Sequence, residues 1–168
     1  ATLDGGADAV ARVEQLAGRL GRNDHRVALW LGSGWQRALD ELNVTATTST
    51  DELAGFQPAG AMGHGSEAHS VRVDAPEGES LQALVFTGRT HLYEGHGPAA
   101  VAHGVRTAAA AGCTVAVLTN AAGCLRSGDA GASDGGPDGA GAAWPIGSPV
   151  LISDQLNPPA GSGPSCGS

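Results

Sequence analysis

Side chains that can do chemistry are concentrated in the segment GRTHLYEGH, residues 88–96, directly after the apolar run LQALVF. In an extended backbone alternate residues project to the same side, so Arg89, His91 and Tyr93 would present a guanidinium, an imidazole and a phenol together. Glu94 can orient a neighbouring histidine or arginine. The planar fork of arginine suits oxyanions, so the segment predicts an anion site. Taken alone, such a polar strand exit is more often a solvated edge.

Two other segments place small or hydroxyl residues directly after apolar runs. Gly32, Ser33 and Gly34 follow VALWL, where backbone N–H groups and a hydroxyl can face an anion at the start of a helix. In isolation this loop is equally well explained as a simple tight turn. A dinucleotide fingerprint is disfavoured because Arg37 stands at its last position. In TNAAGC, the small residue Ala121 lets a backbone amide approach a ligand closely.

The elements that must position these segments indicate an α/β protein. Helices are predicted from apolar spacing and from helix start and stop signals over 7–20, 35–42 and 98–111. Strands are predicted from apolar and β-branched runs over 27–31, in a hairpin within 68–87, over 113–120 and over 149–153. The order strand, helix, strand is typical of a parallel crossover. Ligands of open α/β sheets gather outside the carboxyl ends of the strands, which is where the three segments should meet.

Composition limits the class of protein. The chain has 168 residues and a formal net charge of −8, so we expect one domain and neither nucleic-acid nor membrane partners, both of which need clustered positive charge. Its three cysteines are an odd number without paired spacing, which favours a reduced, cytoplasmic protein over a disulfide framework. No apolar run reaches the length of about 18 residues that a membrane span needs, and the first residues do not resemble a signal peptide.

No metal site is predicted from the histidines and cysteines. The spacing of His91, His96 and His103 does not match a ligand pair on one helix face, and no acidic third ligand is evident. His96 and His103 are therefore predicted at the surface or in helix packing. Cys113 and Cys124 flank a predicted strand and should behave as small apolar residues.

The motifs LGSGW, GHGS, GRTHLYEGH, LTNAAG and PIGSPVLISDQLN occur in this order between Val27 and about Asn157. In combination they resemble the trimeric, human-type purine nucleoside phosphorylases. The resemblance implies a three-layer fold with a mixed, mostly parallel sheet flanked by helices, and a homotrimer acting in purine salvage. It implies reversible phosphorolysis of purine (deoxy)ribonucleosides to the base and pentose 1-phosphate, with phosphate as co-substrate and no metal or organic cofactor. Methylthioadenosine phosphorylases are the second choice, because their equivalent of the arginine and histidine segment differs.

The resemblance also implies roles for individual residues. It assigns phosphate binding to Ser33, His64, Arg89, Thr90, His91 and the backbone of Ala121. Tyr93 would contact the ribose, and Glu94 would hold His91 in orientation, which makes His91 and Glu94 the predicted catalytic residues. Spacing alone favours a solvated loop histidine at His64. Because phosphate itself attacks the anomeric carbon, positioning and charge stabilisation would be the main catalytic tasks.

The sequence departs from the family in length and in two low-complexity segments. Residues 127–143 are nearly all Gly, Ala, Asp, Ser and Pro and predict a loop insert, and residues 158–168 predict a disordered tail. Residues 1–157 are predicted as the N-terminal part of one phosphorylase domain, truncated at its C-terminus by a frame slip or an incomplete gene model. An inactive remnant or an anion-binding module is the alternative function, because later residues of the family read the purine. The preferred base stays open.

Overall fold

The computed structural model describes residues 6–32, 34–57, 66–74, 76, 78–122 and 146–154. The chain divides into two units, residues 1–121 and 122–168. The described residues 146–154 of the second unit contain neither helix nor strand. The prediction of a strand over 149–153 is therefore wrong. Leu151 and Ile152 are 95% and 64% exposed there. An apolar run forms a strand only when a neighbouring strand pairs with it and its side chains are buried.

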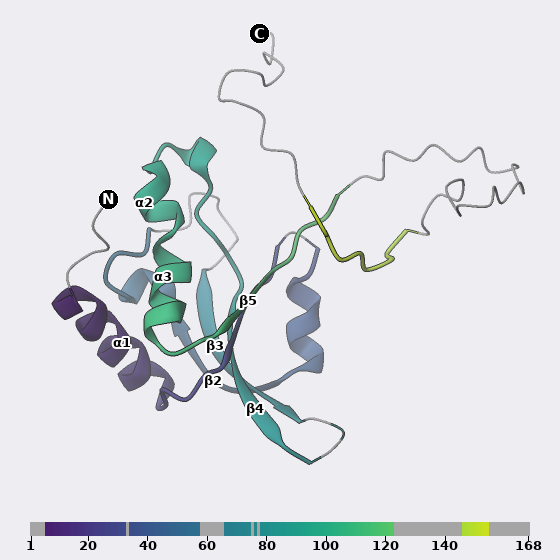
Figure 1. Ribbon diagram of the computed structural model, residues 1–168, viewed down its shortest axis with the longest axis horizontal. Coiled ribbons are helices and arrows are strands. Elements are labelled where there is room, and N and C mark those ends of the chain that lie inside the picture. Colours follow the sequence, from purple (N-terminus) through teal and green to yellow (C-terminus); the bar gives the residue numbers. More distant parts are fainter. Residues whose placement is uncertain are drawn as a thin grey trace, which may run out of the picture. The chain divides into compact units, whose positions relative to one another are not determined.

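A five-stranded sheet forms the centre of the first unit, in the order β2-β3-β4-β1-β5 (Figure 1). The strands are β1 (Val27–Trp30), β2 (Asn43–Ser49), β3 (Glu67–Asp74), β4 (Ser80–Phe86) and β5 (Val115–Leu118). β1 pairs in parallel with β4 and with β5, whereas β3 pairs antiparallel with β2 and with β4. The predicted hairpin, the parallel crossover from β4 to β5 and the mixed sheet are therefore confirmed.

Helical segments cover both faces of the sheet, which confirms the three-layer arrangement (Figure 1). They are α1 (Gly6–Leu20), α2 (Gly97–Val101), α3 (His103–Ala110) and the 3₁₀ segments η1 (Gln36–Glu41), η2 (Thr50–Glu52) and η3 (Leu92–Glu94). On one face, Leu16 of α1 and Ala108 of α3 share a buried cluster with Trp30 and Phe86. On the other face, Leu39 of η1 packs against a second cluster that contains Val85.

Three elements differ from the sequence prediction. The helix expected over 35–42 is the six-residue 3₁₀ segment η1, and the helix expected over 98–111 is divided at Ala102 into α2 and α3. Glycines at positions 97 and 104 lower the helix propensity of the second segment. The strand β2 was not predicted because NVTATTS lacks the apolar alternation of a half-buried strand. It forms at the sheet edge, with an irregular register between Val44 and Ala46.

Two buried histidines that the sequence did not single out lie in or beside the sheet. His25 is 2% exposed, and its Nε2 lies 3.0 Å from the hydroxyl oxygen of Ser70. His69 is 5% exposed, and its Nδ1 lies 2.9 Å from the hydroxyl oxygen of Thr47. Burial lowers the pKa of both imidazoles; Arg22 lowers the pKa of His25 further, while nearby carboxylates oppose the shift at each site. Both side chains therefore favour the neutral form in the folded chain.

We expect the folded chain to lose stability as the pH falls below about 6.5, the ordinary pKa of histidine. The folded state binds fewer protons than the unfolded state because the pKa of His25 and of His69 is lowered by folding, so the free energy of unfolding decreases with falling pH. Urea unfolding at about pH 7.5 and about pH 5.5 measures this decrease. His25→Gln should show a smaller decrease in the free energy of unfolding. His96 is exposed, and His96→Gln should show the same decrease as wild type. Identical decreases in all three chains would refute the role of His25.

Candidate functional site

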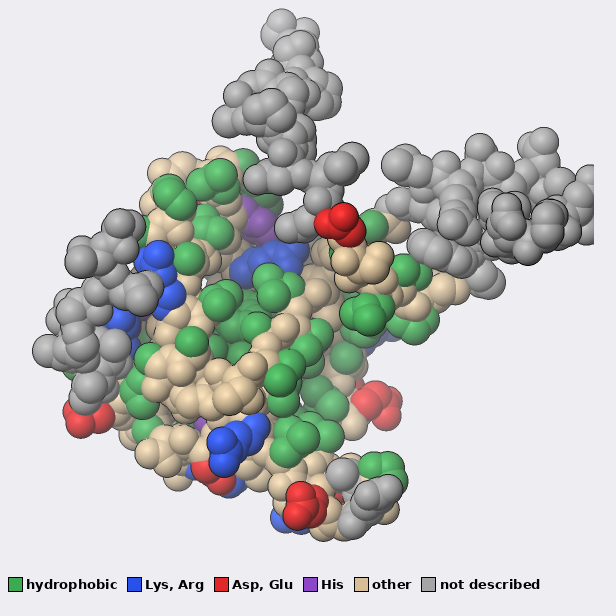
Figure 2. Space-filling model, in the orientation of Figure 1, with side chains coloured by type: hydrophobic (Ala, Val, Ile, Leu, Met, Phe, Trp, Pro, Cys, Tyr) green, Lys and Arg blue, Asp and Glu red, His purple; other side chains and the backbone are tan. Residues whose placement is uncertain are grey.

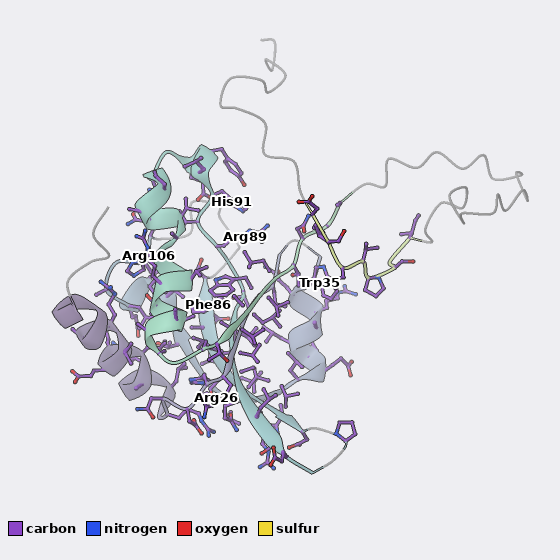
Figure 3. All side chains as sticks on the ribbon, in the orientation of Figure 1. Arg26, Trp35, Phe86, Arg89, His91 and Arg106 are labelled. Carbon is purple, nitrogen blue, oxygen red and sulfur yellow. The ribbon has the colours of Figure 1, made fainter. Side chains whose placement is uncertain are left out.

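The carboxyl ends of β4, β1 and β5 lie side by side because the three strands are parallel neighbours. The segments that leave them begin at Thr87, Leu31 and Thr119. Figure 3 shows Arg89 and His91 at this end of the sheet and Arg26 toward the other end. The prediction that three polar segments meet at one edge is confirmed.

Thr119 connects these strand ends through hydrogen bonds. Its hydroxyl accepts the N–H of Gly32 at 2.9 Å and donates to the carbonyl of Trp30 at 3.0 Å. The Thr119 N–H also donates to the Trp30 carbonyl at 3.0 Å. Its carbonyl oxygen accepts the Arg89 Nη1 at 3.0 Å. The residues after β1, β4 and β5 are thereby held together by one side chain and its backbone.

Gly32 allows the ends of β1 and β5 to approach at backbone distance. A Cβ at this position would overlap the carbonyl oxygen of Thr119 and would lie 3.1 Å from the Cα of Asn120. Its N–H is bonded to Thr119, so this amide does not face a ligand as the sequence prediction had it. The helix dipole expected behind the loop is also reduced, since η1 is a short 3₁₀ segment.

We expect Gly32→Ala to destabilise the chain by about 2 kcal/mol or more, because either β1 or β5 must move to admit the methyl group. This corresponds to a decrease of several degrees in Tm, measurable by circular dichroism. Gly18→Ala is the matched control, because no atom lies within 4 Å of the added Cβ in α1. That control should be neutral or stabilising, since alanine is the better helix former. Equal Tm values for the two variants would contradict the close approach.

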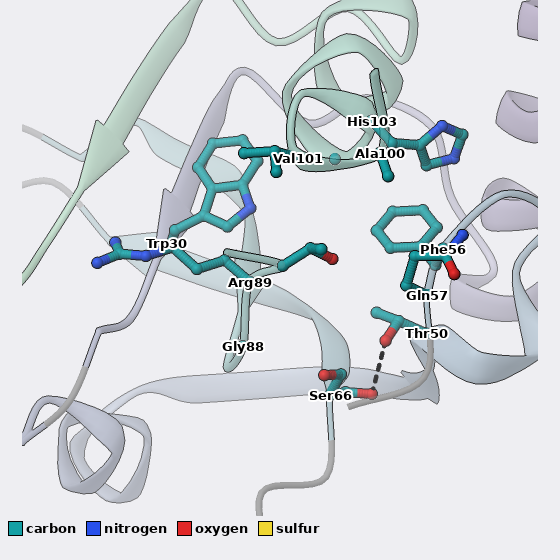
Figure 4. A pocket seen from close by; sticks show the side chains of 12 residues that line it. Trp30, Thr50, Phe56, Gln57, Ser66, Gly88, Arg89, Ala100, Val101 and His103 are labelled. Carbon is teal, nitrogen blue, oxygen red and sulfur yellow. Dashed lines mark hydrogen bonds between the residues drawn. The ribbon is translucent and has the colours of Figure 1, made fainter. Parts of the chain in front are cut away.

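The Arg89 side chain is half-buried and runs past Trp30, away from Phe56, toward the end of β5 (Figure 4). Within the described residues, the guanidinium bonds to Thr119 through Nη1, and a guanidinium has further N–H donors that an oxyanion can accept. Beside it lies a pocket lined by Trp30, Thr50, Phe56, Gln57, Ser66, Gly88, Arg89, Thr90, Ala100, Val101, His103 and Gly104. The ring of Phe86 stacks on Trp30 at a centroid distance of 5.0 Å and so supports this wall.

His91, Tyr93 and Glu94 surround the start of η3. The extended backbone expected from Arg89 to Tyr93 ends at His91, because Leu92 begins a 3₁₀ turn. The His91 and Tyr93 rings nevertheless stack, with centroids 4.8 Å apart and planes inclined by 11°. Glu94 accepts the backbone N–H of His91 at 2.8 Å, so its carboxylate holds the main chain of His91. The Tyr93 side chain is 83% exposed.

The remaining predicted residues are placed as follows. Thr90 lines the pocket beside Arg89, and Ala121 is exposed two residues after Thr119. Ser33 and His64, and also Cys124, lie outside the described residues. His103 packs as predicted, with its Nε2 3.0 Å from the carbonyl oxygen of Ala54.

Cys113 is half-buried, and burial raises the pKa of its thiol. Within the described parts of the chain, no three His, Cys, Asp or Glu side chains form a group that could hold a metal ion. In the same residues no helix has the length and apolar character needed to cross a membrane.

Sequence comparison identifies relatives with one shared activity. Over 148 residues the chain is 41% identical to the purine nucleoside phosphorylase of a Cellulomonas species, and over 153 residues it is 42% identical to that of Mycobacterium tuberculosis. The chain is related to the purine nucleoside phosphorylases. These matches include 88% and 89% of the chain, but only 47% and 50% of the two relatives, so the chain spans about half their length. No family model matches the sequence.

Structural comparison supports the fold. The purine nucleoside phosphorylase of Schistosoma mansoni in complex with acetate matches with a TM-score of 0.58 at 20% sequence identity, over 73% of this chain and 43% of that chain. Isoform 2 from the same organism, in complex with cytosine and ribose-1-phosphate, matches with a TM-score of 0.56 at 20% identity, over 76% and 44%. At this identity the likeness establishes the α/β fold, which agrees with the fold expected from the sequence.

Proposed function

We propose that the chain carries the phosphate-binding part of a purine nucleoside phosphorylase. The enzyme would catalyse reversible phosphorolysis of purine (deoxy)ribonucleosides to the free base and (deoxy)ribose 1-phosphate. The observation that carries the proposal is the position of Arg89, a half-buried guanidinium hydrogen-bonded to the end of β5 in a chain 41% identical to a purine nucleoside phosphorylase.

Phosphate would bind over the carboxyl ends of β1, β4 and β5. Arg89 supplies charge and N–H donors, and Thr90, His91 and the Ala121 backbone add hydrogen-bonding groups from neighbouring segments. A fixed phosphate dianion would stabilise the positive charge that develops on the ribose as the purine leaves. The same roles for Ser33 and His64 remain predictions from the family resemblance.

The ribose would lie against η3. The exposed ring of Tyr93 would offer an apolar surface and a hydroxyl to a sugar, and its stacking on His91 supports a ribose contact next to a phosphate contact. Glu94 would position His91 through the backbone bond at 2.8 Å. His91 and Glu94 are therefore the proposed catalytic pair, with His91 in contact with phosphate and Glu94 positioning it.

The proposal includes a cytoplasmic homotrimer that uses no metal or organic cofactor. Self-association is supported by apolar side chains exposed around η3 and α2: Leu92 is 63% exposed and Val101 is 36% exposed. The odd number of cysteines supports a reduced compartment.

Phosphate binding tests this function directly on the 168-residue chain. Isothermal titration calorimetry with inorganic phosphate should show one saturable site per chain, and chloride at equal ionic strength should show none. Inosine analogues are unnecessary for this step, because only the phosphate contacts are under test. Failure to bind phosphate at millimolar concentrations would contradict the proposal.

An anion-binding module without catalytic activity is the second candidate. It is favoured by β5, whose side chains Val115, Val117 and Leu118 are 51%, 41% and 58% exposed. Figure 2 shows hydrophobic side chains gathered on the face of the molecule that β5 crosses in Figure 1. An apolar edge of this kind promotes association. Light scattering after size exclusion distinguishes the candidates: a uniform trimer supports the phosphorylase, and a monomer or mixed aggregates support the module.

A further inference from the structure

We propose that Thr119 is a positioning residue for phosphate binding, through which the ends of β1 and β5 fix the Arg89 guanidinium. The inference rests on the proposed phosphate site. It concerns a residue that would not itself contact phosphate, since its hydroxyl and carbonyl oxygen are both engaged within the protein.

The hydroxyl of Thr119 acts as acceptor and donor at once. It accepts from Gly32 N–H at 2.9 Å and donates to the Trp30 carbonyl at 3.0 Å. A hydroxyl is one of the few side-chain groups that can satisfy both partners from one atom. Valine has nearly the same shape but would leave the buried Gly32 amide without this acceptor. These contacts therefore depend on the hydroxyl group of Thr119 as well as on the size of its side chain.

The backbone of Thr119 connects these hydrogen bonds to Arg89. The N–H of Thr119 and its hydroxyl both donate to the carbonyl oxygen of Trp30, so two groups of the residue are held to the end of β1. Its carbonyl oxygen then accepts the Arg89 Nη1 at 3.0 Å. Because the guanidinium is planar and rigid, fixing one N–H group restricts the direction of the others. The direction in which Arg89 presents its remaining donors thus depends on the placement of Thr119.

The same contacts explain why the arrangement is closely packed. Because Gly32 has no Cβ, the Thr119 carbonyl oxygen can lie directly against its backbone. Asn120, the next residue, donates from Nδ2 to the Ala121 carbonyl at 3.2 Å, so the segment that leads to the proposed Ala121 amide contact is also ordered locally. A shift of Thr119 would move both the Arg89 partner and this segment.

The test compares three variants of the full chain. Thr119→Val removes the hydroxyl, and Thr119→Ser keeps it with less bulk. Thr114→Val is the matched control, because Thr114 lies just before the other end of β5 and its hydroxyl contacts the Arg26 carbonyl at 3.5 Å. Calorimetry with inorganic phosphate should show about five- to tenfold weaker binding for Thr119→Val, the size expected for an unsatisfied amide. Thr119→Ser and Thr114→Val should bind within about twofold of wild type.

Amide hydrogen exchange gives a second readout that needs no phosphate. The Gly32 N–H should exchange faster in Thr119→Val than in wild type and should stay protected in Thr119→Ser. Equal protection in all three chains would overturn the positioning role. So would wild-type phosphate affinity in Thr119→Val, or an equal loss in Thr119→Ser, which would show that packing rather than the hydroxyl matters. If wild type itself fails to bind phosphate while Gly32 exchange responds as expected, the proposed function fails and the local role of Thr119 stands.

Discussion

The 168-residue chain alone is expected to release no detectable hypoxanthine from inosine in the presence of phosphate. The chain spans 47% of the Cellulomonas relative, and the proposed contacts are to phosphate and ribose, with none assigned to the base. Holding both reactants in attack geometry can account for about 7 to 11 kcal/mol of a barrier. A chain that holds phosphate but has no contact to the purine does not fix the nucleoside, and it should lose most of this advantage.

In the same experiment, a fusion protein is expected to be active. Joining the chain to the part of the Cellulomonas enzyme that it does not match should give phosphate-dependent hypoxanthine release, measured by absorbance in a coupled assay. Leaving phosphate out is the control, since phosphorolysis requires it. Release by the short chain at roughly 1 per second or faster, a rate typical of enzymes, would show that its own residues complete the active site.

The second large effect is expected from Arg89→Ala, which should weaken phosphate binding about ten- to a hundredfold. Removing a charged hydrogen-bond partner costs about 1.5 to 3 kcal/mol, and the Arg89 guanidinium lies at the end of β5, bonded to the Thr119 carbonyl. Arg89→Lys should restore part of the affinity, because lysine keeps the charge and loses the planar fork. Calorimetry with inorganic phosphate measures both variants.

Arg72→Ala is the matched control for this arginine. Arg72 lies in β3 and pairs with Asp74 at 2.8 Å on the exposed part of the hairpin, so its removal changes the net charge equally without touching the site. It should bind phosphate like wild type. Wild-type affinity in Arg89→Ala would place the phosphate elsewhere. A similar loss of affinity in both variants would indicate a general effect of charge.

The strands that position the site were predictable because apolar runs and the polar residues that follow them can be recognised locally in the sequence. The apolar runs before Gly32, Arg89 and Thr119 became β1, β4 and β5, and the helix between the last two required a parallel crossover. These elements alone predict that the three polar segments meet at the carboxyl ends of the parallel strands. Trp30 and Phe86 are partners in the parallel register of β1 and β4, which explains why they face the same cluster.

Other features depended on contacts between distant residues and had no local signal. Thr119 follows β5 like any hydroxyl residue after a strand, and its role appears only when Gly32, 87 positions earlier, is beside it. His25 and Ser70 likewise meet across a separation of 45 positions. The turn of η3 at Leu92 overrode the extended pattern because Glu94 reaches back to the His91 amide. Side-chain hydrogen bonds of this kind compete with extended backbone.

The most direct test of the account is nuclear magnetic resonance of the ¹⁵N-labelled chain during titration with inorganic phosphate. The account predicts saturable shifts of the Arg89 Nε–H and of the Thr90 and Ala121 amides, at the carboxyl ends of β4 and β5, with one common Kd. The amide of Gly78, in the turn between β3 and β4, should not move. Saturable shifts confined to other parts of the chain, or no shifts at all, would contradict a phosphate site at these strand ends.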